Sequence, residues 1–150
     1  MSGVRGGVAH LARRFAGSLS RSEPSAADVA WAQSHLLPKE AALWSRMTVQ
    51  DRRHSLLVAR RFVERRPDAS PAEVAGALLH DIGKLDAGLG TVGRVVATVV
   101  GPRTERFRRY HDHERLGAGL LRDAGSHETT IELTQGRGPA AEFLHAADDL

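Results

Sequence analysis

His80 and Asp81 are the residues whose types and spacing most clearly indicate chemistry in this chain of 150 residues. They stand side by side in the run LLHDIGK (residues 78–84), at the end of an apolar helical pattern. A histidine and an aspartate are costly to bury without partners. A divalent metal ion would satisfy both, because it binds imidazole nitrogen and carboxylate oxygen together. The pair therefore indicates a metal site.

Two further candidate ligands, His54 and Asp148, lie far away in the sequence on other helical segments. Asp149 is the alternative to Asp148, which is favoured by its position directly after Ala147. Two imidazoles and two carboxylates leave room for two waters around a six-coordinate ion. We therefore expect one divalent ion. Mn, Mg, Fe, Co or Ni fits this ligand set better than Zn, which prefers a closed tetrahedral site and is kept as the alternative. The chain has no cysteine, which excludes disulfides, thiolate zinc sites and a cysteine nucleophile.

The elements that must position these residues are helices, since convincing strand alternation is absent. Capping patterns predict helices that begin at Ser25, Thr48 and Ser70, and Pro38 predicts a further start. The helix from Ser25 should end near Leu36 and the one from Pro38 at Met47. The helix from Thr48 should end before Pro67, and the one from Ser70 around a left-handed Gly83. On a regular helix His80 and Asp81 would point about 100° apart, so a shared ion must sit beside its C-terminal end.

The chain is predicted to be a compact all-α bundle of about seven to nine helices in a single domain. Residues 1–24 form a basic, Gly/Ser-rich segment that we expect to be flexible, with one short helix over 10–15. Residues 25–150 hold the folded domain. Its later helices are expected over 91–100, 103–111 and 113–124, the last ended by Gly125, then after Ser126 and from Pro139.

The composition is compatible with an anionic substrate and does not demand nucleic acid as a partner. The net charge is +3 with a pI of about 10.1, because all but two of the basic residues are arginine. Aromatic residues make up 5%, too few for base-stacking platforms, and no nucleic-acid motif is present. No run approaches the ~20 apolar residues of a membrane span, and no secretory signal is visible. We expect a bacterial cytoplasmic protein. The sequence does not decide between a monomer and a homodimer.

With these residues in view, the sequence resembles the HD superfamily of metal-dependent phosphohydrolases. The matching positions are His54, the HDIGK run (residues 80–84) and Asp148, and the resemblance covers roughly residues 35–150. It implies an HD-domain-like fold with His54, His80, Asp81 and Asp148 as metal ligands. It also implies hydrolysis of a phosphoester in a small phosphorylated metabolite or nucleotide by a metal-activated water, with Asp81 and Lys84 as catalytic residues. Lys84 would neutralise the phosphate or the leaving group.

The sequence departs from the paired-metal members of that family. Those members add two histidines between the HD pair and the final aspartate. His113 looks like the first, but no histidine stands near 135–137, where the second would be expected, and His127 comes too early. This departure favours one metal, with His113 facing the substrate and Arg137 as a phosphate contact.

Other interpretations compete with the metal-dependent enzyme. The chain could be a catalytically reduced HD-fold module that binds nucleotides or regulates. Lys84 could be an ordinary charge near a helix C-terminus, and His113 a surface residue. The G-x-G-x-x-G pattern at 88–93 is no dinucleotide site, because no strand precedes it. The remaining residues with a structural interpretation are Trp31 and Trp44 in the core, His127 as a surface or capping residue, and His10, His35, His111 and His145.

Overall fold

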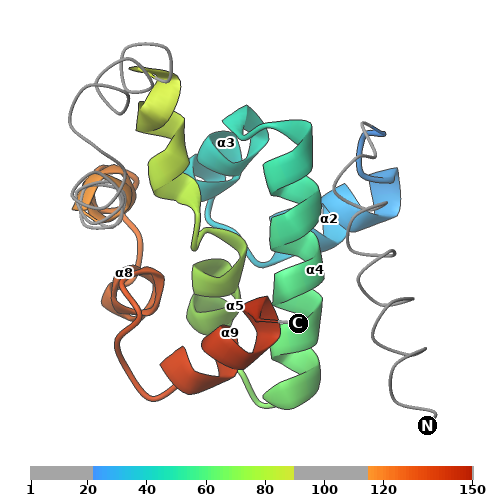
Figure 1. Cartoon of the computed structure of the whole chain (residues 1–150), viewed down its shortest axis with the longest axis vertical. Helices are drawn as coiled ribbons and strands as arrows, with labels where there is room; N and C mark the ends of the chain where they lie inside the picture. The colour runs from blue at the N-terminus through green and yellow to red at the C-terminus, as the bar shows by residue number, and fades with distance from the viewer. Residues whose placement is uncertain (1–21, 90–114, 150) are drawn as a thin grey trace, which may run out of the picture.

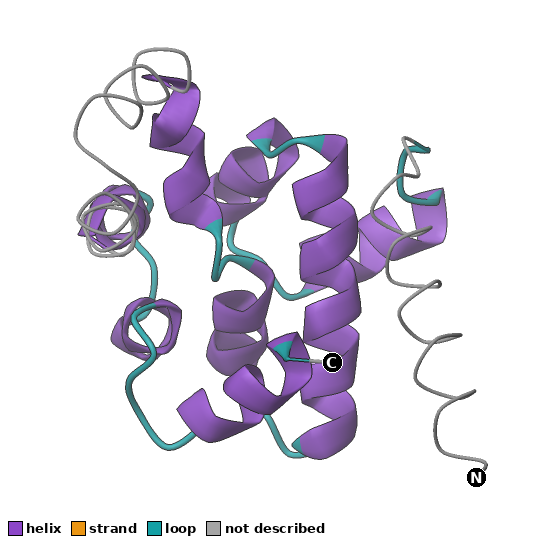
Figure 2. Cartoon of the chain, in the orientation of Figure 1, coloured by secondary structure: helices purple, strands orange, loops and turns teal. Residues whose placement is uncertain are grey.

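The computed structural model describes residues 22–89 and 115–149. Within these two ranges every regular element is a helix and no strand is present (Figure 2), which confirms the predicted all-α class. No helix in these ranges combines the length and the apolar character that crossing a bilayer requires. The helices predicted over 10–15, 91–100 and 103–111 lie outside the described residues.

The helices follow one another with short connections. Their order is α2 (Ala26–Ser34), α3 (Pro38–Arg46), α4 (Val49–Arg65), α5 (Pro71–Leu78), the 3₁₀ helix η1 (Ile82–Leu89), a helix over 115–123, α8 (Glu128–Thr134) and α9 (Ala141–Asp148).

Local capping sets where three of these helices begin, as predicted. The hydroxyls of Ser25, Thr48 and Ser70 each accept a hydrogen bond from the backbone N–H three residues later. Each hydroxyl satisfies one of the N–H groups that a helix start leaves without a partner. Gly125, at φ +74°, ends the helix over 115–123 in the left-handed conformation that glycine adopts readily.

The end of α5 differs from the prediction. The helix stops at Leu78 rather than near Gly83, and Gly83 is not left-handed. The imidazole Nδ1 of His80 lies 2.8 Å from the carbonyl oxygen of Ala77 and supplies the partner that a continuing helix would have supplied. The backbone then tightens, with N–H to carbonyl bonds from Ile82 to Leu79 and from Lys84 to Asp81. The glycines at 88, 90 and 93 predict a loop from Asp86 onward, but residues 86–89 form the second half of η1, up to Leu89.

Helix α4 is the element against which the site is built. Helices α5 and α9 pack on it, and α8 packs on the other side of α5 (Figure 1). Figure 1 shows the C-terminal helix α9 crossing in front of α5. The packing of α9 on α4 brings Asp148 within 2.9 Å of His54. At Gly76 a Cβ would lie 2.8 Å from the Leu133 side chain, so only glycine lets α5 and α8 approach this closely.

The core holds apolar side chains and a few polar ones with partners. Its largest fully buried apolar members are Trp44, Phe62, Leu78, Leu79, Ile82, Leu121 and Leu133. The indole N–H of Trp44 donates to the buried hydroxyl of Ser55 at 2.9 Å. Trp44 is therefore core, as predicted, whereas Trp31 is half-buried at the edge under the guanidinium of Arg60, 4.4 Å from the ring centroid.

Glu40 is a buried carboxylate whose two oxygens both accept hydrogen bonds. Its side chain is on α3 and is 2% exposed. One oxygen accepts the backbone N–H of Leu37 at 2.8 Å, and the other accepts the hydroxyl of Ser126 at 2.6 Å. We call Glu40, Leu37 and Ser126 the Glu40 cluster. It fixes α3 against the segment that leads into α8.

Candidate metal centre

Three elements bring the four predicted ligands to one place. His54 lies on α4, one turn after its start; His80 and Asp81 lie in the turn that follows α5; Asp148 is the last residue of α9. Because α5 ends before the pair, His80 and Asp81 are freed from helical geometry and can point to a common side. Asp149, the alternative to Asp148, is the exposed residue that follows α9.

The separations between the ligand atoms are short. One donor atom each from His54, His80 and Asp81 lies within 4.8 Å of the other two. Nε2 of His80 is 3.4 Å from Oδ2 of Asp81 and 3.6 Å from Oδ1 of Asp148. Nε2 of His54 is 2.9 Å from the same Asp148 oxygen. The two imidazole rings lie with centroids 5.6 Å apart.

These separations match the spacing of donors around one small divalent ion. An octahedral ion with bonds of about 2.1 Å places adjacent donors about 3 Å apart and opposite donors about 4.2 Å apart. The distances of 2.9, 3.4 and 3.6 Å are near the adjacent value. The donor atoms of His54, His80 and Asp81 also all lie within 4.8 Å of one another. The donor set of nitrogen and carboxylate oxygen suits first-row divalent metals.

His80 provides a second observation that fits a cation. Its side chain is 9% exposed, and its buried Nε2 has no hydrogen-bond partner. When neutral, the imidazole donates from Nδ1 to the Ala77 carbonyl, which leaves the Nε2 lone pair facing the oxygens of Asp81 and Asp148. A lone pair that faces two carboxylates needs a positive charge between them. A backbone carbonyl on the far nitrogen is also the usual support of a metal-binding histidine.

Without a metal, protons supply that positive charge. Burial opposes charging of His80, but the carboxylates of Asp148 and Asp81 outweigh it, so the pKa of His80 is raised. The hydrogen bond with His54, and then the attraction of His80 at 3.6 Å, lower the pKa of Asp148 far below its ordinary value. The centre therefore binds positive charge strongly, and a proton and a metal would compete for it.

Lys84 lies beside the four ligands. Its ammonium is 3.1 Å from Oδ2 of Asp81 and 3.9 Å from Oδ1 of Asp51, and its side chain is half exposed. Partial burial opposes its charge, but the attraction of Asp81 and Asp51 prevails and the pKa of Lys84 is raised. Lys84 therefore keeps its proton and presents a fixed positive charge at the edge of the centre.

A pocket of about 380 Å³ opens beside the centre, a volume in the range of small-molecule sites. Four of the predicted residues line it: His80, Asp81, Lys84 and Asp148. The opposite wall comes from the end of α8 and from α9. Its residues are Leu133, Thr134, Gln135, Gly136, Ala141, Leu144 and His145.

Sequence reasoning missed several residues of this site. His145 was assigned a structural role, yet it lines the pocket one turn before Asp148 on α9. The i, i+3 spacing to Asp148 could have identified it. Asp51 precedes His54 by the same spacing on α4. Thr134, Gln135 and Gly136 carried no signal, because their position depends on how α8 packs against α5.

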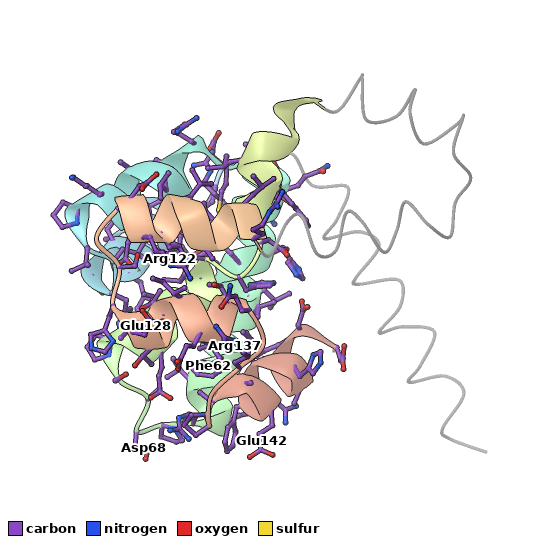
Figure 3. All side chains as sticks on the ribbon, turned by 90° about the vertical axis from the view of Figure 1, so that its left-hand side faces the viewer. Phe62, Asp68, Arg122, Glu128, Arg137 and Glu142 are labelled. Atoms are coloured by element: carbon purple, nitrogen blue, oxygen red, sulfur yellow. The ribbon has the colours of Figure 1, made fainter. Side chains whose placement is uncertain are left out.

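Two predicted substrate contacts are not part of the described centre. His113 lies outside the described residues. Arg137 is exposed and does not line the 380 Å³ pocket, and its guanidinium donates to the Gln135 side chain. It lines a second pocket of about 290 Å³, formed by the start of α5, by α8 and by the segment that leads into α9. Figure 3 shows Arg137 just past the end of α8, with Glu142 at the outer edge of α9.

Comparisons of the chain with protein-family models, with curated proteins and with solved structures find no match.

Proposed function

We propose that this protein is a hydrolase of phosphate monoesters that depends on one divalent metal ion, as in the HD superfamily that its sequence resembles. The observation that carries the proposal is the buried, unpartnered Nε2 of His80 facing two carboxylates at the wall of a pocket. His54, His80, Asp81 and Asp148 would hold the ion. When bound, it supplies a Lewis acid and lowers the pKa of a bound water.

The residues of the chain divide the remaining work. The Ala77 carbonyl orients the imidazole of His80, and the ion pair with Lys84 orients the carboxylate of Asp81. The ammonium of Lys84 adds a positive charge at the wall of the pocket, where it would attract a phosphoryl group. The hydrophobic side chains of Leu133 and Leu144 form an apolar floor for the organic part of the ester.

The size of the pocket supports a small substrate. A volume of about 380 Å³ accommodates a phosphorylated metabolite or a mononucleotide rather than a polymer. The net charge of +3 favours the approach of an anion. We therefore expect the substrate to be a small phosphorylated compound, and hydrolysis to need no nucleic acid, membrane or second subunit.

The test is a substrate screen on protein loaded with Mn²⁺. We expect turnover of p-nitrophenyl phosphate and of at least one small phosphorylated metabolite, abolished by a chelator and by Asp81→Ala. Glu142→Ala is the matched control, because that carboxylate is on α9 but does not line the pocket. Metal-dependent binding of nucleotides with no turnover of any ester would contradict hydrolysis and support the alternative, a module that binds or regulates.

A further inference from the structure

We propose that His145 is the general acid that protonates the leaving alcohol. The inference rests on the proposed function and adds a catalytic residue to it. Breaking the ester bond of an alkyl phosphate leaves an alkoxide, which is a poor leaving group unless it gains a proton. A positioned acid contributes typically ~10²- to 10⁴-fold to such a step. The chain must therefore present a proton donor beyond the phosphoryl group, on the side away from the metal ligands.

His145 has the required position. It lies on α9 three residues before Asp148, and both side chains line the same pocket. Residues three apart share one face of a helix, with Cβ atoms about 5–6 Å apart. A phosphoryl group that contacts the centre through one oxygen carries its ester oxygen to a point roughly one helical turn, about 5 Å, away. That displacement along α9 leads from Asp148 to His145.

The state of His145 also fits this role. Its imidazole makes no hydrogen bond or ion pair with any other residue that the structure describes, whereas His54 faces Asp148 and His80 faces Ala77 and two carboxylates. The side chain is exposed, so solvent can restore its proton. Histidine is also the residue type that exchanges protons most readily near neutral pH.

The other groups of the described pocket wall are poorer donors. Lys84 is held in its charged form by Asp81 and Asp51. Asp81 and Asp148 are proposed metal ligands. The side chains of Thr134 and Gln135 do not give up protons near neutral pH.

Hydrolysis of the ester transfers one proton from His145 to the leaving oxygen. Water attacks phosphorus and loses one proton to solvent as the new P–O bond forms. The bond from phosphorus to the alkoxy oxygen breaks, and its electron pair stays on that oxygen. The oxygen takes the proton of the His145 imidazolium and departs as an alcohol. Solvent then returns a proton to the neutral imidazole, so no oxidant, reductant or second substrate is needed.

Leaving groups of different acidity test the inference. We compare p-nitrophenyl phosphate, whose phenolate needs little protonation, with glycerol 2-phosphate, whose alkoxide needs it fully. We expect His145→Gln to lower kcat on glycerol 2-phosphate by ~10²-fold or more and on p-nitrophenyl phosphate by less than about threefold. His127→Gln is the matched control: that histidine caps α8, does not line the pocket, and should alter the two rates alike.

A second measurement does not depend on turnover. Adding inorganic phosphate to protein loaded with Mg²⁺ should shift the imidazole NMR signals of His145 and leave those of His127 unchanged. Equal losses on the two esters, no loss on either, or an unmoved His145 signal would overturn the inference and leave the proposed function standing. A wild type that hydrolyses neither ester would overturn both.

Discussion

The Glu40 cluster and the candidate metal centre both contain buried polar side chains, but only in the Glu40 cluster does the buried side chain have all its hydrogen-bond partners. Both oxygens of Glu40 accept hydrogen bonds from neutral donors, Leu37 N–H and the Ser126 hydroxyl. In the candidate metal centre, Nε2 of His80 is buried without a hydrogen-bond partner and faces two carboxylates. In the first arrangement the chain supplies every hydrogen-bond partner, whereas in the second it leaves a buried nitrogen beside two carboxylates, where we propose that a cation binds.

This difference teaches how to separate structural from functional polar groups. Two other buried nitrogens in the described ranges also have no hydrogen bond, Nε of Arg52 and Nε of Arg66. Each belongs to a guanidinium that forms an ion pair, with Glu23 and with Glu73, respectively. Nε2 of His80 also has no hydrogen bond and lies 3.4 Å from Asp81 and 3.6 Å from Asp148, but an imidazole, unlike a guanidinium, carries a positive charge there only when it binds a further proton. A buried acceptor beside other acceptors is therefore the signal of a missing ligand.

The largest expected effect is on activity, at Asp148. Asp148→Asn should lower phosphatase activity by ~10³-fold or more and weaken Mn²⁺ binding, because the amide removes a negative ligand. It should change the free energy of unfolding of the metal-free protein by less than about 1 kcal/mol, since the His54–Asp148 pair is substantially exposed. Steady-state kinetics and chemical denaturation measure the two effects. A variant with full activity would contradict the assignment.

The next effect is on stability, at Glu40. Glu40→Ala should lower the free energy of unfolding by about 2–4 kcal/mol, because it leaves a cavity and deprives the Leu37 N–H and the Ser126 hydroxyl of their acceptor. Mn²⁺ affinity should stay within about twofold. Urea denaturation and calorimetric titration check these outcomes. Glu40→Gln is the control, because its amide oxygen can accept the Leu37 N–H and its amide nitrogen can donate to the Ser126 hydroxyl oxygen. A large loss of metal affinity in the alanine variant would show that the two groups are not independent.

The smallest effect is the pH dependence of metal binding. Asp148 and Asp81 outweigh the effect of burial and raise the pKa of His80, and a metal can bind Nε2 only after the proton has left. Mn²⁺ affinity should therefore rise by about tenfold per pH unit up to that raised pKa and then level off. Calorimetric titration in buffers of different ionisation enthalpy should detect the released proton. An affinity that stays constant from pH 6 to 8 would remove His80 from the ligand set.

The sequence was sufficient for features that depend on neighbouring residues. The starts of α2, α4 and α5 follow from Ser25, Thr48 and Ser70, whose hydroxyls bond within the first helical turn. The all-α class follows in the same way from the repeat of apolar positions. His127 also caps α8 through Thr129, within the surface or capping role predicted for it.

Features that depend on distant contacts could not be predicted in this way. The early end of α5 results from the bond between the His80 side chain and Ala77, which competes with continuation of the helix. The pocket wall at Gln135 and His145 exists because α8 and α9 pack against α5 and α4. No local pattern records which face of a short helix such packing will bring to a pocket.

Calorimetric titration of metal-free protein with Mn²⁺ tests the central claim most directly, because it measures the cation that the centre is proposed to require. The account predicts about one equivalent bound by the wild type and an affinity at least ~100-fold weaker in His80→Ala. The Glu40→Gln variant should bind as the wild type does. Absence of binding to the wild type, or equal affinity in the wild type and His80→Ala, would contradict the account.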